Sequence, residues 1–115
     1  HPMLIKSRRK NGTAHLAIDF ERNEIKRRRP GDYWVILSPM GKIWCLVRVV
    51  SVTDYPFNQV PEAWAAVEGE GDISLRWWQD AHRAYYQKQC GLWRIKWSED
   101  YLVVCESWEL VAAAS

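Results

Sequence analysis

Two apolar runs joined by a short turn form the clearest pattern in the chain. Residues 33–37 and 43–52 are rich in β-branched and aromatic side chains, and residues 38–41 between them (Ser-Pro-Met-Gly) are typical of a turn. This pattern predicts a β-hairpin. Both faces of the second run are largely apolar, so we expect a central strand. Arg48 interrupts it, and a charge there favours an ion pair, for instance with a carboxylate of residues 68–72, over ligand contact.

Further strands are predicted on both sides of the hairpin. Residues 13–20 (Thr-Ala-His-Leu-Ala-Ile-Asp-Phe) have the composition of a strand, residues 92–97 that of a short strand or extended edge, and residues 101–111 that of a final strand. A short basic helix is expected over residues 3–10. It would end at the following Asn-Gly pair, because glycine is common just past the end of a helix.

Helical spacing predicts two helices between the hairpin and the last strands. The first covers residues 58–67, and the second begins at a cap supplied by Asp72 or Ser74 and stops at residues 90–91 (Cys-Gly). The apolar stripe of the second helix consists of Leu75, Trp78, Ala81, His82 and Tyr85. A histidine on such a stripe, here His82, is more often a satisfied core residue than a catalyst.

The order of these elements predicts an α+β fold. Helices grouped between strands suit a small, mixed but mainly antiparallel sheet closed into a barrel, with two or three helices. We expect one domain over residues 3–111, with residues 1–2 and 112–115 as tails or cloning remnants.

Composition narrows the class of protein. The chain of 115 residues is 48% hydrophobic and 26% charged, which is typical of a globular domain. Its eight tryptophans suit either a core or surfaces that stack against flat ligands. The three cysteines lack a C-x-x-C spacing, which argues against a disulfide framework or a zinc site. Without a predicted membrane span or signal peptide, we expect a cytoplasmic protein.

Charge is distributed unevenly along the chain. The net charge is +2, yet the segment through Pro30 holds nine basic and three acidic residues, so the remainder is net negative. A basic arm of this kind favours a polyanionic partner such as RNA, because bound arginines and lysines release counterions. A solvated charged face that keeps the protein soluble explains the same pattern equally well.

A knot of carboxylates and glycines lies between the two predicted helices. Glu68, Glu70 and Asp72 alternate with Gly69 and Gly71, a spacing that serves packing poorly and brings like charges together. Upstream, Lys10 and Thr13 are three residues apart and could point into one pocket. If lysine and Glu68 meet, they could bind a phosphate or activate the threonine hydroxyl, although a structural Lys–Glu ion pair is the simpler interpretation.

The chain resembles an ASCH domain of the bacterial stand-alone kind over nearly its whole length. The residues that carry the resemblance are Pro30-Gly31-Asp32-Tyr33, Phe57-Asn58-Gln59-Val60, Ala66-Val67-Glu68-Gly69-Glu70-Gly71-Asp72, Ser74-Leu75, Trp78, His82 and Val104-Cys105-Glu106, with Lys10 and Thr13 in register with the K-x-x-T first strand of the family. This resemblance implies a PUA-like β-barrel whose cleft faces RNA or a nucleoside. One branch of the family hydrolyses N4-acetylcytidine and related amides with a Lys, Thr and Glu triad, and another is ribonucleolytic.

Three hypotheses for function follow. In the first, the cleft binds RNA or a nucleotide, with phosphate contacts and base stacking from Arg8, Arg9, Arg27, Arg28, Arg29 and Trp78. In the second, the same cleft is hydrolytic, with Lys10 as base, Thr13 as nucleophile and Glu68 as proton shuttle. Ribonuclease chemistry could add a divalent metal ion held by Glu68, Glu70 or Asp72. In the third, the domain is a catalytically silent interaction module. The oligomeric state stays open.

Overall fold

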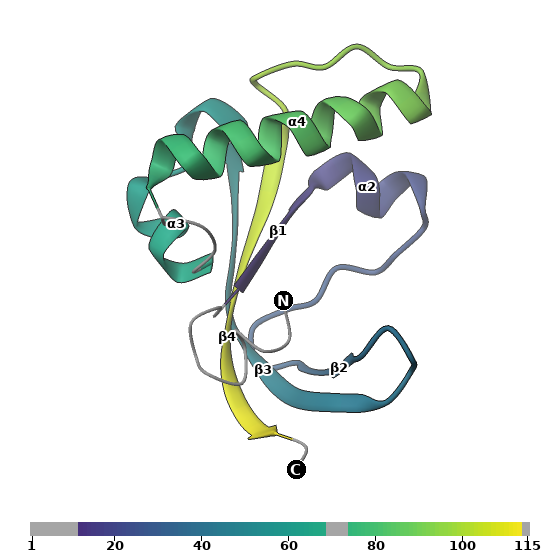
Figure 1. The fold of residues 1–115 in the computed structure, drawn as a ribbon, viewed down its shortest axis with the longest axis vertical. Helices are drawn as coiled ribbons and strands as arrows, with labels where there is room; N and C mark the ends of the chain where they lie inside the picture. Colours follow the sequence, from purple (N-terminus) through teal and green to yellow (C-terminus); the bar gives the residue numbers. More distant parts are fainter. Residues whose placement is uncertain (1–11, 69–73, 114–115) are drawn as a thin grey trace.

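A computed structural model describes residues 12–68 and 74–113. The elements follow the order β1 (Gly12–Leu16), α2 (Ala17–Arg22), β2 (Tyr33–Leu37), β3 (Ile43–Pro56), a 3-10 turn η1 (Phe57–Gln59), α3 (Glu62–Glu68), α4 (Leu75–Trp93) and β4 (Leu102–Ala113). The four strands form one antiparallel sheet in the order β1-β4-β3-β2. The predicted α+β class is confirmed, with the described strands forming a curled half-barrel (Figure 1).

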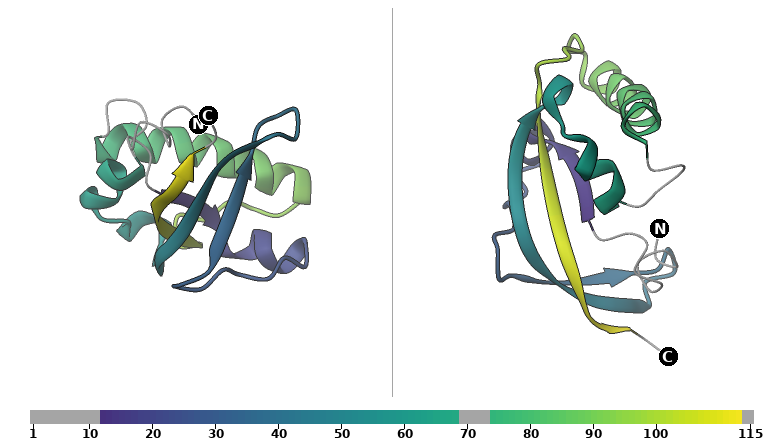
Figure 2. Two further views of the ribbon diagram at one scale, coloured as in Figure 1. Left: turned by 90° about the horizontal axis from the view of Figure 1, so that it is seen from below. Right: turned by 90° about the vertical axis from the view of Figure 1, so that its left-hand side faces the viewer.

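Two long strands give the sheet its curvature. β3 and β4 run side by side, and register shifts interrupt their pairing after Leu46 and after Val49. Such bulges increase local twist and bend the strands. Figure 2 shows the two strands bowing away from α3 and α4, which cover one face of the sheet. The predicted hairpin is confirmed, and β3 is an interior strand as its apolar faces indicated.

The two faces of the sheet bury different cores. The larger core lies under α3 and α4 and includes Trp78, Tyr86 and Phe57. The smaller core lies on the other face of the sheet, around Val47 and Trp108. Because side chains alternate along a strand, β1 and β4 contribute to both faces.

Local signals explain most boundaries. The Ser74 hydroxyl caps α4 by accepting from the Trp77 backbone N–H at 3.0 Å, which agrees with one of the two predicted caps. α4 continues through residues 90–91 instead of stopping there. It ends where Arg94 adopts a left-handed φ of 59°, with the Ile95 N–H bonded to the Cys90 carbonyl, a Schellman arrangement that any residue tolerating positive φ can close.

Three predictions of secondary structure need correction or lie outside the described residues. The predicted strand over 13–20 ends at Leu16, because the chain turns into the short helix α2 with Phe20 packed inward. Residues 92–97 are not a strand, since the last turn of α4 and a loop occupy them. The helix expected over 3–10 falls outside the described residues.

Candidate functional site

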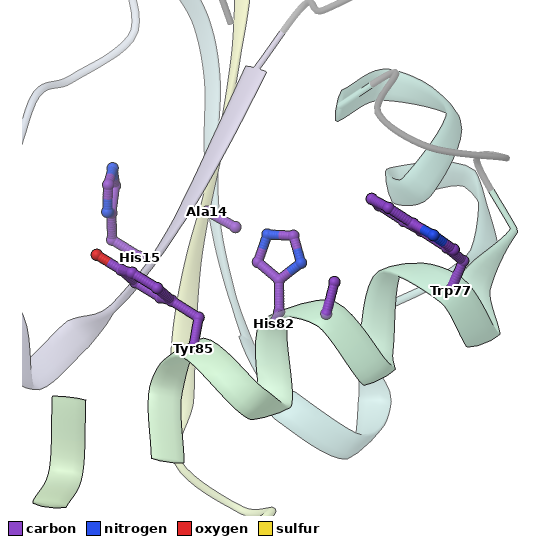
Figure 3. A pocket seen from close by; sticks show the side chains of 6 residues that line it. Ala14, His15, Trp77, His82 and Tyr85 are labelled. Atoms are coloured by element: carbon purple, nitrogen blue, oxygen red, sulfur yellow. The ribbon is translucent and has the colours of Figure 1, made fainter. Parts of the chain in front are cut away.

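A hollow of about 280 Å³ lies between the edge strand β1 and helix α4. We call it the β1–α4 hollow, and its lining consists of Ala14, His15, Trp77, Ala81, His82 and Tyr85. Figure 3 shows the His82 ring projecting from α4 between Trp77 on one side and Tyr85 with His15 on the other. Trp77 is 38% and Tyr85 55% exposed, so both aromatic walls have surface free for contact. These walls suit a flat ligand.

The helix presents these walls because of its periodicity. Residues 77, 81 and 85 follow one another at four-residue spacing, each one position before a member of the more buried row Trp78, His82 and Tyr86. The Tyr86 hydroxyl donates to the Ala14 carbonyl at 3.0 Å, which fixes α4 against β1. Burial raises the pKa of Tyr86 well above its usual value, so the hydroxyl keeps the proton it donates.

His82 shares a proton with Glu68. His82 Nδ1 lies 2.9 Å from the Trp78 carbonyl, and a carbonyl only accepts, so Nδ1 carries a proton. Nε2 lies 3.1 Å from Glu68 Oε2, an approach that requires one proton between the two atoms. This contact places a hydrogen-bonded imidazole–carboxylate pair at the wall of the hollow. The sequence pattern favoured a core residue at His82, and α3 supplies a carboxylate partner for it through Glu68.

Glu68 is an unusual carboxylate. Its side chain is 2% exposed at the end of α3, and no described residue hydrogen-bonds its Oε1. A buried oxygen without a partner is costly and needs an explanation. A ligand N–H group, or a residue outside the described ranges, would satisfy it.

Thr13 and His15 form a second polar pair. They project from the same side of β1, opposite the buried Gly12, Ala14 and Leu16, and Thr13 Oγ1 lies 3.2 Å from His15 Nε2. Burial lowers the pKa of His15, with smaller opposing effects from Asp19 and other charges. A neutral imidazole can accept the threonine proton, which is the arrangement of a nucleophile beside a base.

The structure only partly assembles the predicted catalytic set. The described hydrogen-bond partner of the Thr13 hydroxyl is His15, while Glu68 pairs with His82 on the helical side of β1. Lys10 falls outside the described residues. His15 is a site residue that the sequence analysis missed, although strand alternation places it on the same face as Thr13.

A second hollow of about 200 Å³ shares one wall with the first. We call it the α2–β2 hollow, and it is lined by His15, Asp19, Phe20, Ile25, Arg28 and Trp34. The Arg28 guanidinium lies 3.7 Å from the centre of the Trp34 ring, and its Nε donates to Glu106 Oε1 at 2.5 Å. The Trp108 indole N–H donates to the same oxygen at 2.9 Å. Glu106, 2% exposed, therefore has two donors.

Two of the arginines predicted to contact nucleic acid form ion pairs within the domain. Arg27 is ion-paired with Asp54 and Arg28 with Glu106, so their charges are largely offset. The Arg29 side chain has no ion-pair partner among the described residues, and Arg8 and Arg9 fall outside them. Arg48 pairs with Glu109 on the neighbouring strand, which corrects the expected link to residues 68–72.

Trp78 is a core residue, so the prediction that it stacks an RNA base is wrong. Its side chain is 1% exposed, with the His82 ring stacked at 4.2 Å and the Phe57 ring stacked at 5.9 Å between centroids. Burial of the Trp78 indole in the hydrophobic core leaves it unavailable to the ligand that the sequence analysis assigned to it. The exposed neighbour Trp77 provides the accessible indole instead.

The described residues contain no group of three metal-ligating side chains. Glu70 and Asp72, two of the three candidate metal ligands, lie outside them, and Glu68 has a histidine beside it. Within residues 12–68 and 74–113, no helix is long and apolar enough to cross a membrane.

Comparisons with known proteins identify the family. The family model of the ASCH domain matches residues 2–112. The crystal structure of an ASCH domain from Lactobacillus crispatus superposes with a TM-score of 0.87 at 34% identity, covering 95% of this chain and 69% of that one. A protein from Enterococcus faecalis gives a TM-score of 0.84 at 26% identity, covering 96% and 66%. Comparison with curated sequences gives no match. The chain belongs to the ASCH domain family.

Proposed function

We propose that this ASCH domain binds RNA or a nucleoside, with one base in the β1–α4 hollow. The observation that carries the proposal is the lining of the hollow, where Trp77 and Tyr85 expose aromatic surface beside two imidazoles. Its volume of about 280 Å³ is at the lower end for ligand pockets, which suits one nucleoside. Single-stranded RNA is recognised chiefly by stacking of splayed bases on such side chains.

Polar groups at the back of the hollow would orient the base. His82 Nε2 lies 3.1 Å from Glu68 Oε2, and Glu68 Oε1 has no described donor. The Watson–Crick edge of a base carries N–H groups and acceptors suited to such a pair. Stacking would supply affinity, and these hydrogen bonds would supply orientation.

The contribution of phosphate contacts is expected to be modest. Arg27 and Arg28 already pair with carboxylates, whereas Arg22, Lys26 and Arg29 have no ion-pair partner among the described residues. Each neutralised phosphate of a single strand contributes a slope of about −0.7 in log affinity against log salt. Binding of a short RNA that is insensitive to salt would remove the basic arm from this proposal.

The test compares two tyrosines by calorimetric titration with the four ribonucleosides and with a short single-stranded RNA. Tyr85→Ala should weaken binding about 5- to 150-fold, since a stacked base contributes about 1–3 kcal/mol. Tyr33→Ala is the matched control, because Tyr33 is 62% exposed on β2 and lines neither hollow. Equal effects of the two variants, or no binding by the unaltered protein, would contradict the proposal.

A second candidate is hydrolysis of an amide on the bound nucleoside. The observation that favours it is the Thr13 hydroxyl 3.2 Å from His15 Nε2. Thr13 would attack the amide carbon while His15 takes the hydroxyl proton and delivers it to the departing amine, and water would then release the acyl group. The triad that the family implies, with Lys10 as base and Glu68 as proton shuttle, is the alternative route for the same proton.

Product analysis distinguishes these candidates. We would incubate the protein with N4-acetylcytidine and with single-stranded RNA, with and without a divalent metal ion. Under the hydrolysis hypothesis, Thr13→Val and Lys10→Ala lose the cytidine product, while Thr13→Val still binds the substrate. Metal-dependent RNA fragments would favour a ribonuclease that uses Glu68, Glu70 or Asp72. If neither product forms, the binding function stands alone, and absence of binding as well would leave a silent interaction module.

A further inference from the structure

The two hollows meet at His15. The imidazole of His15 lines the β1–α4 hollow together with residues of α4, and it lines the α2–β2 hollow together with residues of α2, β2 and the loop between them. Figure 1 shows β1 lying between α4 and the β2–β3 hairpin, and His15 of this strand lines both hollows, so a ligand that crosses β1 at His15 can contact both. We propose that the α2–β2 hollow takes the nucleotide next to the base bound in the β1–α4 hollow. The ligand is then a strand of at least two nucleotides, an inference that rests on the proposed function.

Arg28 is the residue of this second subsite that is held in place to contact a base. Its guanidinium lies flat enough against Trp34 to approach the ring centre at 3.7 Å, and Glu106 holds its Nε from a fully buried position. A guanidinium plane stacks bases as aromatic rings do. Because the plane is already fixed between Trp34 and Glu106, a base that stacks on it orders little additional side chain.

The same side chain retains hydrogen-bond donors. Nε is hydrogen-bonded to Glu106, and no described residue accepts from the two Nη atoms. Arginine carries donors on both of those atoms, so they can reach a phosphate oxygen or a base edge. Because Glu106 offsets the charge of Arg28, the contact between its Nη donors and the ligand depends on hydrogen-bond geometry more than on long-range attraction.

The remaining lining completes a place for a base. Phe20 and Ile25 supply apolar surface, and the Asp19 carboxylate supplies an acceptor for a ribose hydroxyl or a base N–H. The volume of about 200 Å³ suits a single base more than a larger group. The phosphate that joins the two nucleosides would pass His15, the residue common to both hollows.

The experiment measures affinity for the four ribonucleoside 5′-monophosphates and for the dinucleotides CpC, UpU, ApA and GpG. A dinucleotide should bind about 5- to 150-fold more tightly than its monophosphate, the gain expected for one more stacked base. Arg28→Lys keeps a positive charge for Glu106 but removes the flat plane, so it should weaken dinucleotide binding far more than monophosphate binding and thereby abolish this gain. Arg48→Lys is the matched control, because Arg48 forms an exposed ion pair with Glu109 and lines neither hollow.

Each outcome decides between the two levels of the proposal. Equal affinity for dinucleotide and monophosphate, or equal weakening of both by Arg28→Lys, overturns the second subsite and leaves base binding in the first hollow intact. No binding of either ligand overturns both. If Arg28→Lys fails to fold by circular dichroism, Ile25→Glu replaces it. Ile25 is 52% exposed at the wall of the second hollow, and a carboxylate there should also remove the dinucleotide gain.

Discussion

Two buried carboxylates on opposite faces of the sheet have opposite environments. Glu106 and Glu68 are each 2% exposed. Glu106 meets a guanidinium and an indole N–H, so its charge is matched by a partner that stays protonated in proteins. Glu68 meets an imidazole at 3.1 Å, and its second oxygen has no described partner.

This difference indicates that Glu106 is a structural carboxylate, whereas Glu68 is available for binding or proton transfer. A buried charge is tolerated when its partners are permanent, as at Glu106, where the ion pair links the loop before β2 to β4. A histidine partner can lose its charge, and an unpartnered oxygen can accept from a ligand. Glu68 therefore has the features expected of a site, and Glu106 those expected of its support.

The largest effect is expected from removing the charge of the structural carboxylate Glu106. Glu106→Gln leaves the Arg28 guanidinium charged without a counter-ion, because arginine does not deprotonate. The free energy of unfolding should fall by about 2–3 kcal/mol, below the full cost for a buried pair because Arg28 keeps 22% of its side chain exposed. Urea denaturation measures this change. A loss under about 0.5 kcal/mol would place this pair with ordinary surface ion pairs.

Gly12→Ala tests whether the surroundings of Glu106 and of Glu68 depend on the same close packing around β1. An added Cβ at Gly12 would collide with the Glu106 carbonyl oxygen and lie 2.8 Å from the Trp64 indole of α3, the helix that ends at Glu68. Backbone cannot move aside as a flexible side chain does, so we expect a loss of about 2 kcal/mol. Thermal and urea unfolding should agree. Gly91→Ala is the control, because an added methyl there meets nothing within 4 Å.

Glu68→Gln sharpens the comparison by making the same substitution at the other carboxylate. His82 can become neutral, so no uncompensated charge remains, and the free energy of unfolding should change by less than about 1 kcal/mol. Nucleoside affinity should nevertheless fall roughly 10-fold, the value of a hydrogen bond to a charged group. Calorimetry beside urea denaturation measures both quantities. A variant that loses stability but keeps affinity would reverse the assignment of roles.

The smallest effect concerns pH. Burial lowers the pKa of His15 below its ordinary 6.5, so at mildly acidic pH the unfolded chain binds more protons than the folded one. The stability present above about pH 6.5 is therefore lost as pH falls through the folded pKa of His15. His15→Gln should flatten this part of the profile in urea denaturation at pH 7.5, 6.5 and 5.5. An unchanged slope would show that other groups dominate the titration.

Sequence reasoning succeeded where the local structure depends mainly on a residue and its neighbours in the chain. The turn before β3, the apolar runs of the hairpin and the Ser74 cap each act through neighbours in the chain, and each prediction is confirmed. It failed at residues 92–97, where a left-handed Arg94 sets the helix end, and at Trp78. Apolar stripes show which residues share a helix face, but the packing partners decide whether a tryptophan is core or wall.

The sequence by itself determined the α+β class, the family and the residue types available to a site, because periodicity, caps and motifs are local properties. Only tertiary structure decided that Glu68 meets His82, that Glu106 meets Arg28, and that His15 separates two hollows. Arg28 and Glu106 are 78 positions apart in the chain. The reason is that such contacts depend on how the sheet curls and where α3 and α4 pack on it, which is set by the burial of whole faces and not by any single segment.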